Sequence, residues 1–163
     1  MTSGQWQAAA VVRRPVSAAQ SSCANRRWWD GAADEYQAEH GGFLRDVGFV
    51  WGPEGLDEAE ARLLGEVRGK RVLEIGCGAA QCSRWLAAQG ASVVGFDLSY
   101  RQLQHARRID RATGTAVPVV QADAAAIPFR DRSFDLACSA FGALPFVADA
   151  RAVLAAVHRV LRP

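Results

Sequence analysis

A glycine turn between a short apolar run and an amphipathic segment constrains the fold of this chain most. Residues 71–75 are typical of a buried strand, Gly76-Cys77-Gly78 of a tight turn, and residues 80–89 of a helix. Glycines let a backbone bend sharply and let a ligand approach it closely. The free N–H groups at the start of the following helix favour an anion. The turn is therefore the first candidate binding site.

Strand-like and helix-like segments alternate along the rest of the chain. Further strands are expected at residues 92–96, 117–121 and 134–138. Helices are expected at residues 56–67 and 149–161, and another helix begins at Ser99, which has the spacing of a capping box with Gln102. This alternation predicts parallel βαβ units. We predict an α/β fold, a Rossmann-like doubly wound parallel sheet of four strands in the order 3-2-1-4 with helices on both faces. Pro118 lacks an N–H group and places the third strand near the edge.

The first part of the chain lacks this regular pattern. Residues 1–24 are predicted to form a disordered or loosely ordered tail, residues 25–53 an aromatic N-terminal helical segment, and residues 54–163 the domain itself. No apolar run approaches the roughly 20 residues that a membrane span needs. The formal net charge of +2 gives no argument for a nucleic-acid partner. We expect a cytoplasmic protein that binds no nucleic acid.

The cysteine and histidine pattern gives no sign of a metal site. The chain contains Cys23, Cys77, Cys82 and Cys138 without any CxxC spacing, and His40, His105 and His158 lie far from them in sequence. We therefore expect no metal and reduced cytosolic thiols.

Two acidic residues follow later strands at the edge where the glycine turn lies. Asp97 ends the second strand, and a carboxylate there can accept hydrogen bonds from both hydroxyls of a ribose. Asp123 follows the third strand and can accept from an exocyclic amine such as that of adenine, with the Ala124 N–H serving a ring nitrogen. The three loop ends together predict a site for an adenosine-containing ligand.

A nicotinamide dinucleotide is a weaker candidate for this ligand. The dinucleotide fingerprint GxGxxG requires a third glycine where the chain has Gln81. The chain also carries Glu74 just ahead of the turn, and a pyrophosphate site does not need an acid there. A nicotinamide-dependent oxidoreductase thus remains the weaker alternative function.

The chain resembles the class I S-adenosylmethionine-dependent methyltransferases over residues 56–163. The similarity lies in the runs VLEIGCGAAQCSRWLA, VVGFDLS, QADAAAIPFRDRSFDLACS and RVLRP, in this order, as in the small-molecule, methyltransferase type 11-like members. The resemblance implies S-adenosylmethionine as cofactor and S-adenosylhomocysteine as product. It also implies a small-molecule methyl acceptor, such as a sugar, a lipid or another metabolite.

The resemblance assigns nine residues to the cofactor, in four groups. The methionine end would be held by Glu74, Gly76, Cys77 and Gly78, the ribose by Asp97 with Leu98 packing on adenine, the adenine edge by Asp123 and Ala124, and the approach to the methyl group by Ala140. Trp28, Trp29 and Tyr36 resemble an aromatic lid over the cofactor. No catalytic residue is assigned, because no His, Asp or Glu follows the fourth strand until Asp149.

The chain departs from the family pattern in two places. The third glycine of the family's turn is Ala80 here, and we expect tolerance because alanine favours helix. The family sheet has seven strands and this chain has four, so we expect the natural protein to continue past Pro163. The open edge of the fourth strand is then an expected site of self-association. A non-catalytic cofactor-binding fragment stays open as the alternative to an enzyme.

Overall fold

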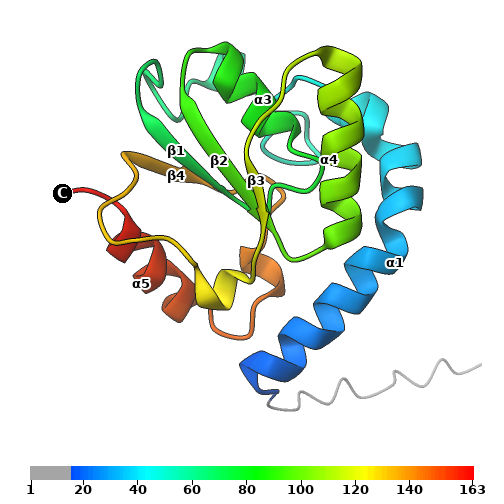
Figure 1. The fold of residues 1–163 in the computed structure, drawn as a ribbon, viewed down its shortest axis with the longest axis vertical. Coiled ribbons are helices and arrows are strands. Elements are labelled where there is room, and N and C mark those ends of the chain that lie inside the picture. Colours follow the sequence, from blue (N-terminus) through cyan, green and yellow to red (C-terminus); the bar gives the residue numbers. More distant parts are fainter. Residues whose placement is uncertain (1–15) are drawn as a thin grey trace, which may run out of the picture.

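The computed structural model describes residues 16–163, and the first part of the predicted N-terminal tail lies outside them. Its elements are α1 (Ala18–Leu44), α2 (Glu58–Ala61), β1 (Arg71–Ile75), α3 (Gln81–Ala88), β2 (Ser92–Asp97), α4 (Tyr100–Thr113), β3 (Val119–Gln121), η1 (Ala124–Ala126), β4 (Leu136–Cys138), η2 (Leu144–Phe146) and α5 (Ala150–Val160). Figure 1 shows the sheet between α5 on one side and α3 and α4 on the other, with α1 running alongside α4.

The four strands form one parallel sheet in the order β3-β2-β1-β4, which confirms the predicted fold class and strand order. Successive residues of a strand point to opposite faces. Val72 accordingly packs with Leu86 on the α3 face, while Leu73 packs with Val153 on the α5 face. β1 is buried on both faces, and this burial fixes the position of the glycine turn at its carboxyl end.

The N-terminal helix is longer than the sequence predicted. α1 begins at Ala18, with Ser17 and Gln20 forming a complete capping box at its start. The boundary expected after residue 24 was therefore wrong, because residues 18–24 form the first turns of this helix. Position 24 is an alanine in the helix and is no break.

Three other boundaries differ from the prediction. The helix expected at residues 56–67 is only α2, because Arg62 adopts a left-handed conformation with φ of 50°. The buried Glu58 carboxylate then accepts hydrogen bonds from the Leu63 and Leu64 backbone N–H groups. β3 and β4 are both shorter than expected. Phe134, ahead of β4, instead forms an isolated parallel bridge with Leu161.

The capping box expected at the start of α4 is only half formed. Ser99 accepts a hydrogen bond from the Gln102 backbone N–H at 3.1 Å. The Gln102 side chain does not return the bond, because its oxygen accepts a hydrogen bond from Gln37 on α1. Within residues 16–163, no helix combines the length and the apolar character that crossing a membrane requires.

Candidate functional site

A pocket of about 700 Å³, including its open mouth, lies beyond the carboxyl ends of β1 and β2. Its floor comes from the glycine turn and the end of β2, and its cover from α1 and the segment that follows β4. Ligands of doubly wound sheets bind at this place, where the strand order reverses. Five predicted site residues line the pocket: Gly76, Gly78, Asp97, Leu98 and Ala124.

The turn after β1 and the loop after β4 approach each other closely at Gly76, and this approach requires glycine there. Its φ is 69°, and a side chain at this position would place Cβ 2.8 Å from the backbone nitrogen of Ala143. Only glycine adopts that conformation without strain and leaves room for the loop after β4. Cys77, the middle residue of the turn, is buried and packs with Leu103 away from the pocket.

Ala80 tests the prediction about the family's third glycine. Its φ is 61°, in the left-handed region, and it lies just ahead of α3. The reason given for its tolerance was therefore wrong, because helix propensity does not act on a residue in this conformation. Ala80 is fully buried beside Ala106, and this apolar packing accompanies the unfavourable backbone conformation.

Asp97 connects the end of β2 to the glycine turn. Its Oδ2 accepts a hydrogen bond from the Gly78 backbone N–H at 2.8 Å, and its Oδ1 accepts one from the Ser99 N–H at 2.8 Å. Burial raises the pKa of Asp97 above its usual value, against the effect of these backbone hydrogen bonds. Each carboxylate oxygen keeps a second lone pair for a ligand hydroxyl.

Glu74 lies beneath the turn and does not line the pocket. It is 2% exposed, and its carboxylate accepts a hydrogen bond from the Ser83 hydroxyl on α3. Burial raises the pKa of Glu74 to about 7, and the hydrogen bonds from Ser83 only partly oppose this shift. The structure thus places Glu74 where it supports the turn from below.

The remaining predicted residues lie beside the pocket wall. Asp123 caps η1, accepting a hydrogen bond from the Ala125 N–H at 2.8 Å, while its neighbours Ala122 and Ala124 line the pocket. Ala140 is buried in the core on the α3 side. The residues that follow it, Phe141 to Ala143, reach the pocket instead.

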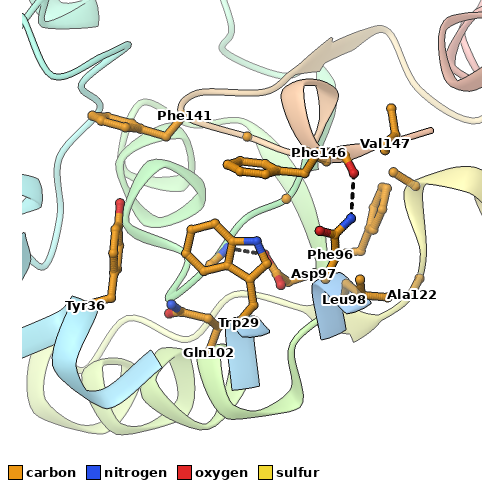
Figure 2. Close-up of a pocket in the computed structure, with 16 residues that line it drawn as sticks. Trp29, Tyr36, Phe96, Asp97, Leu98, Gln102, Ala122, Phe141, Phe146 and Val147 are labelled. Carbon is orange, nitrogen blue, oxygen red and sulfur yellow. Dashed lines mark hydrogen bonds between the residues drawn. The ribbon is translucent and has the colours of Figure 1, made fainter. Parts of the chain in front are cut away.

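Aromatic residues of α1 form much of the cover. Trp29 and Tyr36 line the pocket, and their ring centroids are 5.6 Å apart with an edge-to-face geometry. Trp29 makes a similar contact with Phe146 of η2 at 5.4 Å. Figure 2 shows these rings, together with Phe141, around the open space above the turn. Trp28 is 61% exposed and lies outside this set.

Polar contacts hold α1 against the rest of the domain. Asp30 accepts hydrogen bonds from the Ser99 hydroxyl at 2.6 Å and from the Arg101 N–H at 3.1 Å. Asp34 pairs with Arg101 and His105 on α4, at 2.6 and 2.7 Å. Ala33 is the one buried residue of α1. These polar groups therefore act together with the edge-to-face contact of Trp29 with Phe146 in docking α1.

Arg84 is a structural residue that the sequence analysis missed. Its side chain is fully buried and donates hydrogen bonds to the Ala79 carbonyl at 2.6 Å and to Asp110 at 2.9 Å. It therefore fastens the glycine turn to α4. A buried guanidinium without such partners would carry a large desolvation cost.

No group of three or more His, Cys, Asp or Glu side chains within the described part of the chain is arranged to hold a metal ion. The four cysteines are free thiols. Burial raises the pKa of Cys77, Cys82 and Cys138 well above the usual value, so that these thiols stay protonated. Among the described residues, the pocket is lined by aromatic and aliphatic side chains, backbone groups, the amides of Asn25 and Gln102 and one carboxylate, and no cysteine lines it.

Comparison with known proteins gives consistent matches to methyltransferases. The family described as "Methyltransferase domain" matches residues 72–163. A demethylmenaquinone methyltransferase from Clavibacter sepedonicus is 41% identical over 106 residues, which is 64% of this chain and 42% of that protein. A malonyl-[acyl-carrier protein] O-methyltransferase from Pseudescherichia vulneris is 39% identical over 100 residues, or 61% of this chain and 38% of that protein.

A solved structure shows the same similarity in three dimensions. An S-adenosylmethionine-dependent methyltransferase from Mesorhizobium loti is 38% identical, with a TM-score of 0.56 over 64% of this chain and 47% of that one. The matched part of the chain covers between 38% and 47% of the length of these three proteins.

Proposed function

The chain belongs to the class I S-adenosylmethionine-dependent methyltransferases, and we propose that it binds this cofactor in the pocket and transfers the methyl group to a small molecule. The observation that carries the proposal is the contact between Asp97 and the glycine turn. It brings an acceptor for ribose hydroxyls next to a backbone that a ligand can approach closely.

The residues present fit the parts of S-adenosylmethionine. Asp97 would accept hydrogen bonds from the ribose, and Leu98 and Ala124 would enclose the adenine in apolar surroundings. The amino-acid end would lie on the turn formed by Gly76 and Gly78, where no Cβ obstructs the backbone. Asp123, next to Ala124, stays a prediction for the adenine amine.

The bound cofactor supplies an electrophilic methyl group, which an acceptor lone pair attacks in line while the bond to sulfur breaks. The contribution of this chain is to position the donor and to exclude water. Holding donor and acceptor in a reactive geometry removes much of the entropic barrier of such a displacement. Trp29 and Tyr36 cover part of the pocket, which keeps an open mouth. Asp97 is the one charged side chain on the described pocket wall, and we assign no general base.

A small molecule is the acceptor class that we favour. The relatives compared above are named for demethylmenaquinone and for a malonyl group on acyl-carrier protein, which are chemically unlike acceptors. The net charge of +2 gives no argument for a nucleic-acid acceptor.

The proposal is tested by incubating the protein with methyl-labelled S-adenosylmethionine and a panel of acceptors. The panel contains a quinol, a hydroxylated sugar, a malonyl thioester and a mixed RNA. We expect label in at least one small acceptor and none in RNA, with Asp97→Ala lowering transfer and the exposed-site variant Asp131→Ala leaving it unchanged. Label in RNA alone, or transfer insensitive to Asp97→Ala, would contradict the proposal.

A further inference from the structure

Gln102 of α4 presents a buried amide to the pocket. The residue is 2% exposed, and it lines the pocket together with the glycine turn. Its Oε1 accepts a hydrogen bond from the Gln37 Nε2 of α1 at 2.9 Å. Within residues 16–163, no protein atom accepts a hydrogen bond from the Gln102 Nε2, although every enclosed side-chain nitrogen and oxygen there has a partner. This Nε2 is therefore not enclosed by protein and opens into the pocket.

Three glutamines from three helices form a hydrogen-bonded chain that ends at the pocket. The Gln81 Nε2 of α3 donates to the Gln37 Oε1 at 3.1 Å, and the Gln37 Nε2 donates to the Gln102 Oε1 at 2.9 Å. An amide oxygen only accepts and an amide nitrogen only donates, so the chain runs in one direction. Because Gln37 donates to the oxygen of Gln102, the nitrogen of Gln102 is left for the pocket. Hydrogen bonds in such a chain strengthen one another and hold this orientation.

Three backbone N–H groups of the glycine turn already have acceptors within the protein. The Cys77 N–H donates to the Phe96 carbonyl at 2.9 Å, and the Ala80 N–H donates to the Cys77 carbonyl at 2.7 Å. The Gly78 N–H donates to the Asp97 carboxylate at 2.8 Å. These three groups are thus engaged before any ligand binds. An anion placed on the turn needs a donor from another element.

The described pocket wall supplies no positive charge for such an anion. No arginine, lysine or histidine is among the described residues that line it. Its other side-chain amide is Asn25, whose Nδ2 already donates to the Ser21 hydroxyl and the Phe146 carbonyl. Gln102 is therefore the one side-chain amide of this wall that is free to donate. A carboxylate held by such a donor forms a stronger hydrogen bond than a neutral acceptor does.

We propose that the Gln102 Nε2 donates a hydrogen bond to the α-carboxylate of the cofactor, and that Gln37 is the residue that positions this amide. The inference rests on the proposed function, in which Asp97 binds the ribose and Leu98 lies beside the adenine. Figure 2 shows Gln102 on the side of Asp97 opposite to Leu98. The amino-acid part of the cofactor extends from the ribose away from the adenine, which brings its carboxylate to this side. The pocket then distinguishes the complete cofactor from adenosine compounds that lack the amino acid.

The test compares two ligands of the full chain by calorimetry, S-adenosylhomocysteine and 5′-methylthioadenosine. The second ligand keeps the adenosine and the sulfur but lacks the amino acid and its carboxylate. Gln102→Met keeps the length of the side chain and removes the donor. We expect this variant to bind S-adenosylhomocysteine about ten- to a hundredfold more weakly, the size of one hydrogen bond to a charged group. Its affinity for 5′-methylthioadenosine should stay within about twofold of the wild-type value.

Two further variants separate positioning from packing. Gln37→Leu leaves Gln102 in place but frees its amide to turn, and should weaken S-adenosylhomocysteine alone, by about two- to tenfold. Gln104→Met is the matched control on the same helix, because Gln104 accepts a hydrogen bond from the Arg101 side chain and does not line the pocket. It should bind both ligands as the wild-type protein does.

The outcomes separate this inference from the proposed function. Unchanged binding of S-adenosylhomocysteine by Gln102→Met would overturn the inference. Equal weakening of both ligands would also overturn it, since Gln102 would then only support the shape of the pocket. In both cases the proposed function stands if Asp97→Ala weakens both ligands, because both carry the ribose. Failure of the folded wild-type protein to bind either ligand would overturn the inference and the proposed function together.

Discussion

The Asp97 carboxylate accepts a hydrogen bond from the Gly78 backbone N–H at 2.8 Å and thereby joins the end of β2 to the turn after β1. This contact is local in space although the residues are separated by a helix in sequence. It sets the distance between the part of the pocket suited to a ribose and the part suited to an amino acid. The geometry of the proposed cofactor site therefore depends on it.

Gly76→Ala should destabilise the protein more than the same change at another left-handed glycine. Gly114 has φ of 70° and open space around it, so alanine there should cost only the backbone strain, about 1–2 kcal/mol. At Gly76 the new Cβ would also lie 2.8 Å from the Ala143 backbone nitrogen, which cannot yield as a flexible side chain can. Denaturant unfolding of both variants measures the difference, and equal losses would contradict the packing described for the turn.

Glu74→Gln should change how stability depends on pH. Burial raises the pKa of Glu74 from its ordinary 4.5 to about 7, so the folded protein holds this proton more tightly than the unfolded chain does. The contribution of Glu74 to the free energy of unfolding is then fully present below about pH 4.5 and falls as pH rises towards 7. The neutral glutamine avoids this loss and can still accept the hydrogen bond from Ser83.

Between about pH 4.5 and pH 7, the free energy of unfolding of the variant should therefore rise relative to that of the wild-type protein by about 3 kcal/mol. Urea unfolding at a series of pH values measures the difference between the two proteins, in which the other titrating groups cancel. A difference that is constant with pH would show that Glu74 titrates normally.

Asp30→Ala should loosen α1 without affecting the sheet. The substitution removes the acceptor for the Ser99 hydroxyl and the Arg101 N–H, two contacts that fasten α1 to the start of α4. Amide hydrogen exchange in residues 18–44 should accelerate about tenfold, while exchange in β1 stays unchanged. Glu35→Ala, at an exposed position of the same helix, is the control. Equal protection of α1 in both variants would mean that apolar contacts hold the helix.

The sheet could be predicted from the sequence because its signals are local. Apolar runs between turns mark the strands, and the expected limits of β1, residues 71–75, are those of the structure. The strand order follows from parallel βαβ connections, and the edge position of β3 is consistent with the missing N–H of Pro118. Gly76, Gly78 and Asp97 could then be predicted as site residues, since they lie at or just after the carboxyl ends of β1 and β2.

The cover of the pocket and its buried polar supports could not be predicted in this way. Asn25 donates a hydrogen bond to the Phe146 carbonyl across 121 residues, and no periodicity in the chain indicates that pairing. Arg84 has the appearance of an ordinary polar helix residue, yet it is fully buried because Asp110 and the Ala79 carbonyl both accept from it. Such positions depend on long-range packing and not on local pattern.

The central claim is that this pocket binds the adenosyl cofactor through Asp97, and titration of S-adenosylhomocysteine into the protein by calorimetry tests it most directly. Loss of a charged hydrogen-bond acceptor should cost about 1.5–3 kcal/mol, so Asp97→Ala should weaken binding by about ten- to a hundredfold. Asp131→Ala, which removes an exposed carboxylate paired with Arg159, should bind as the wild-type protein does. A folded protein that does not bind the ligand, or Asp97→Ala binding with unchanged affinity, would contradict the claim.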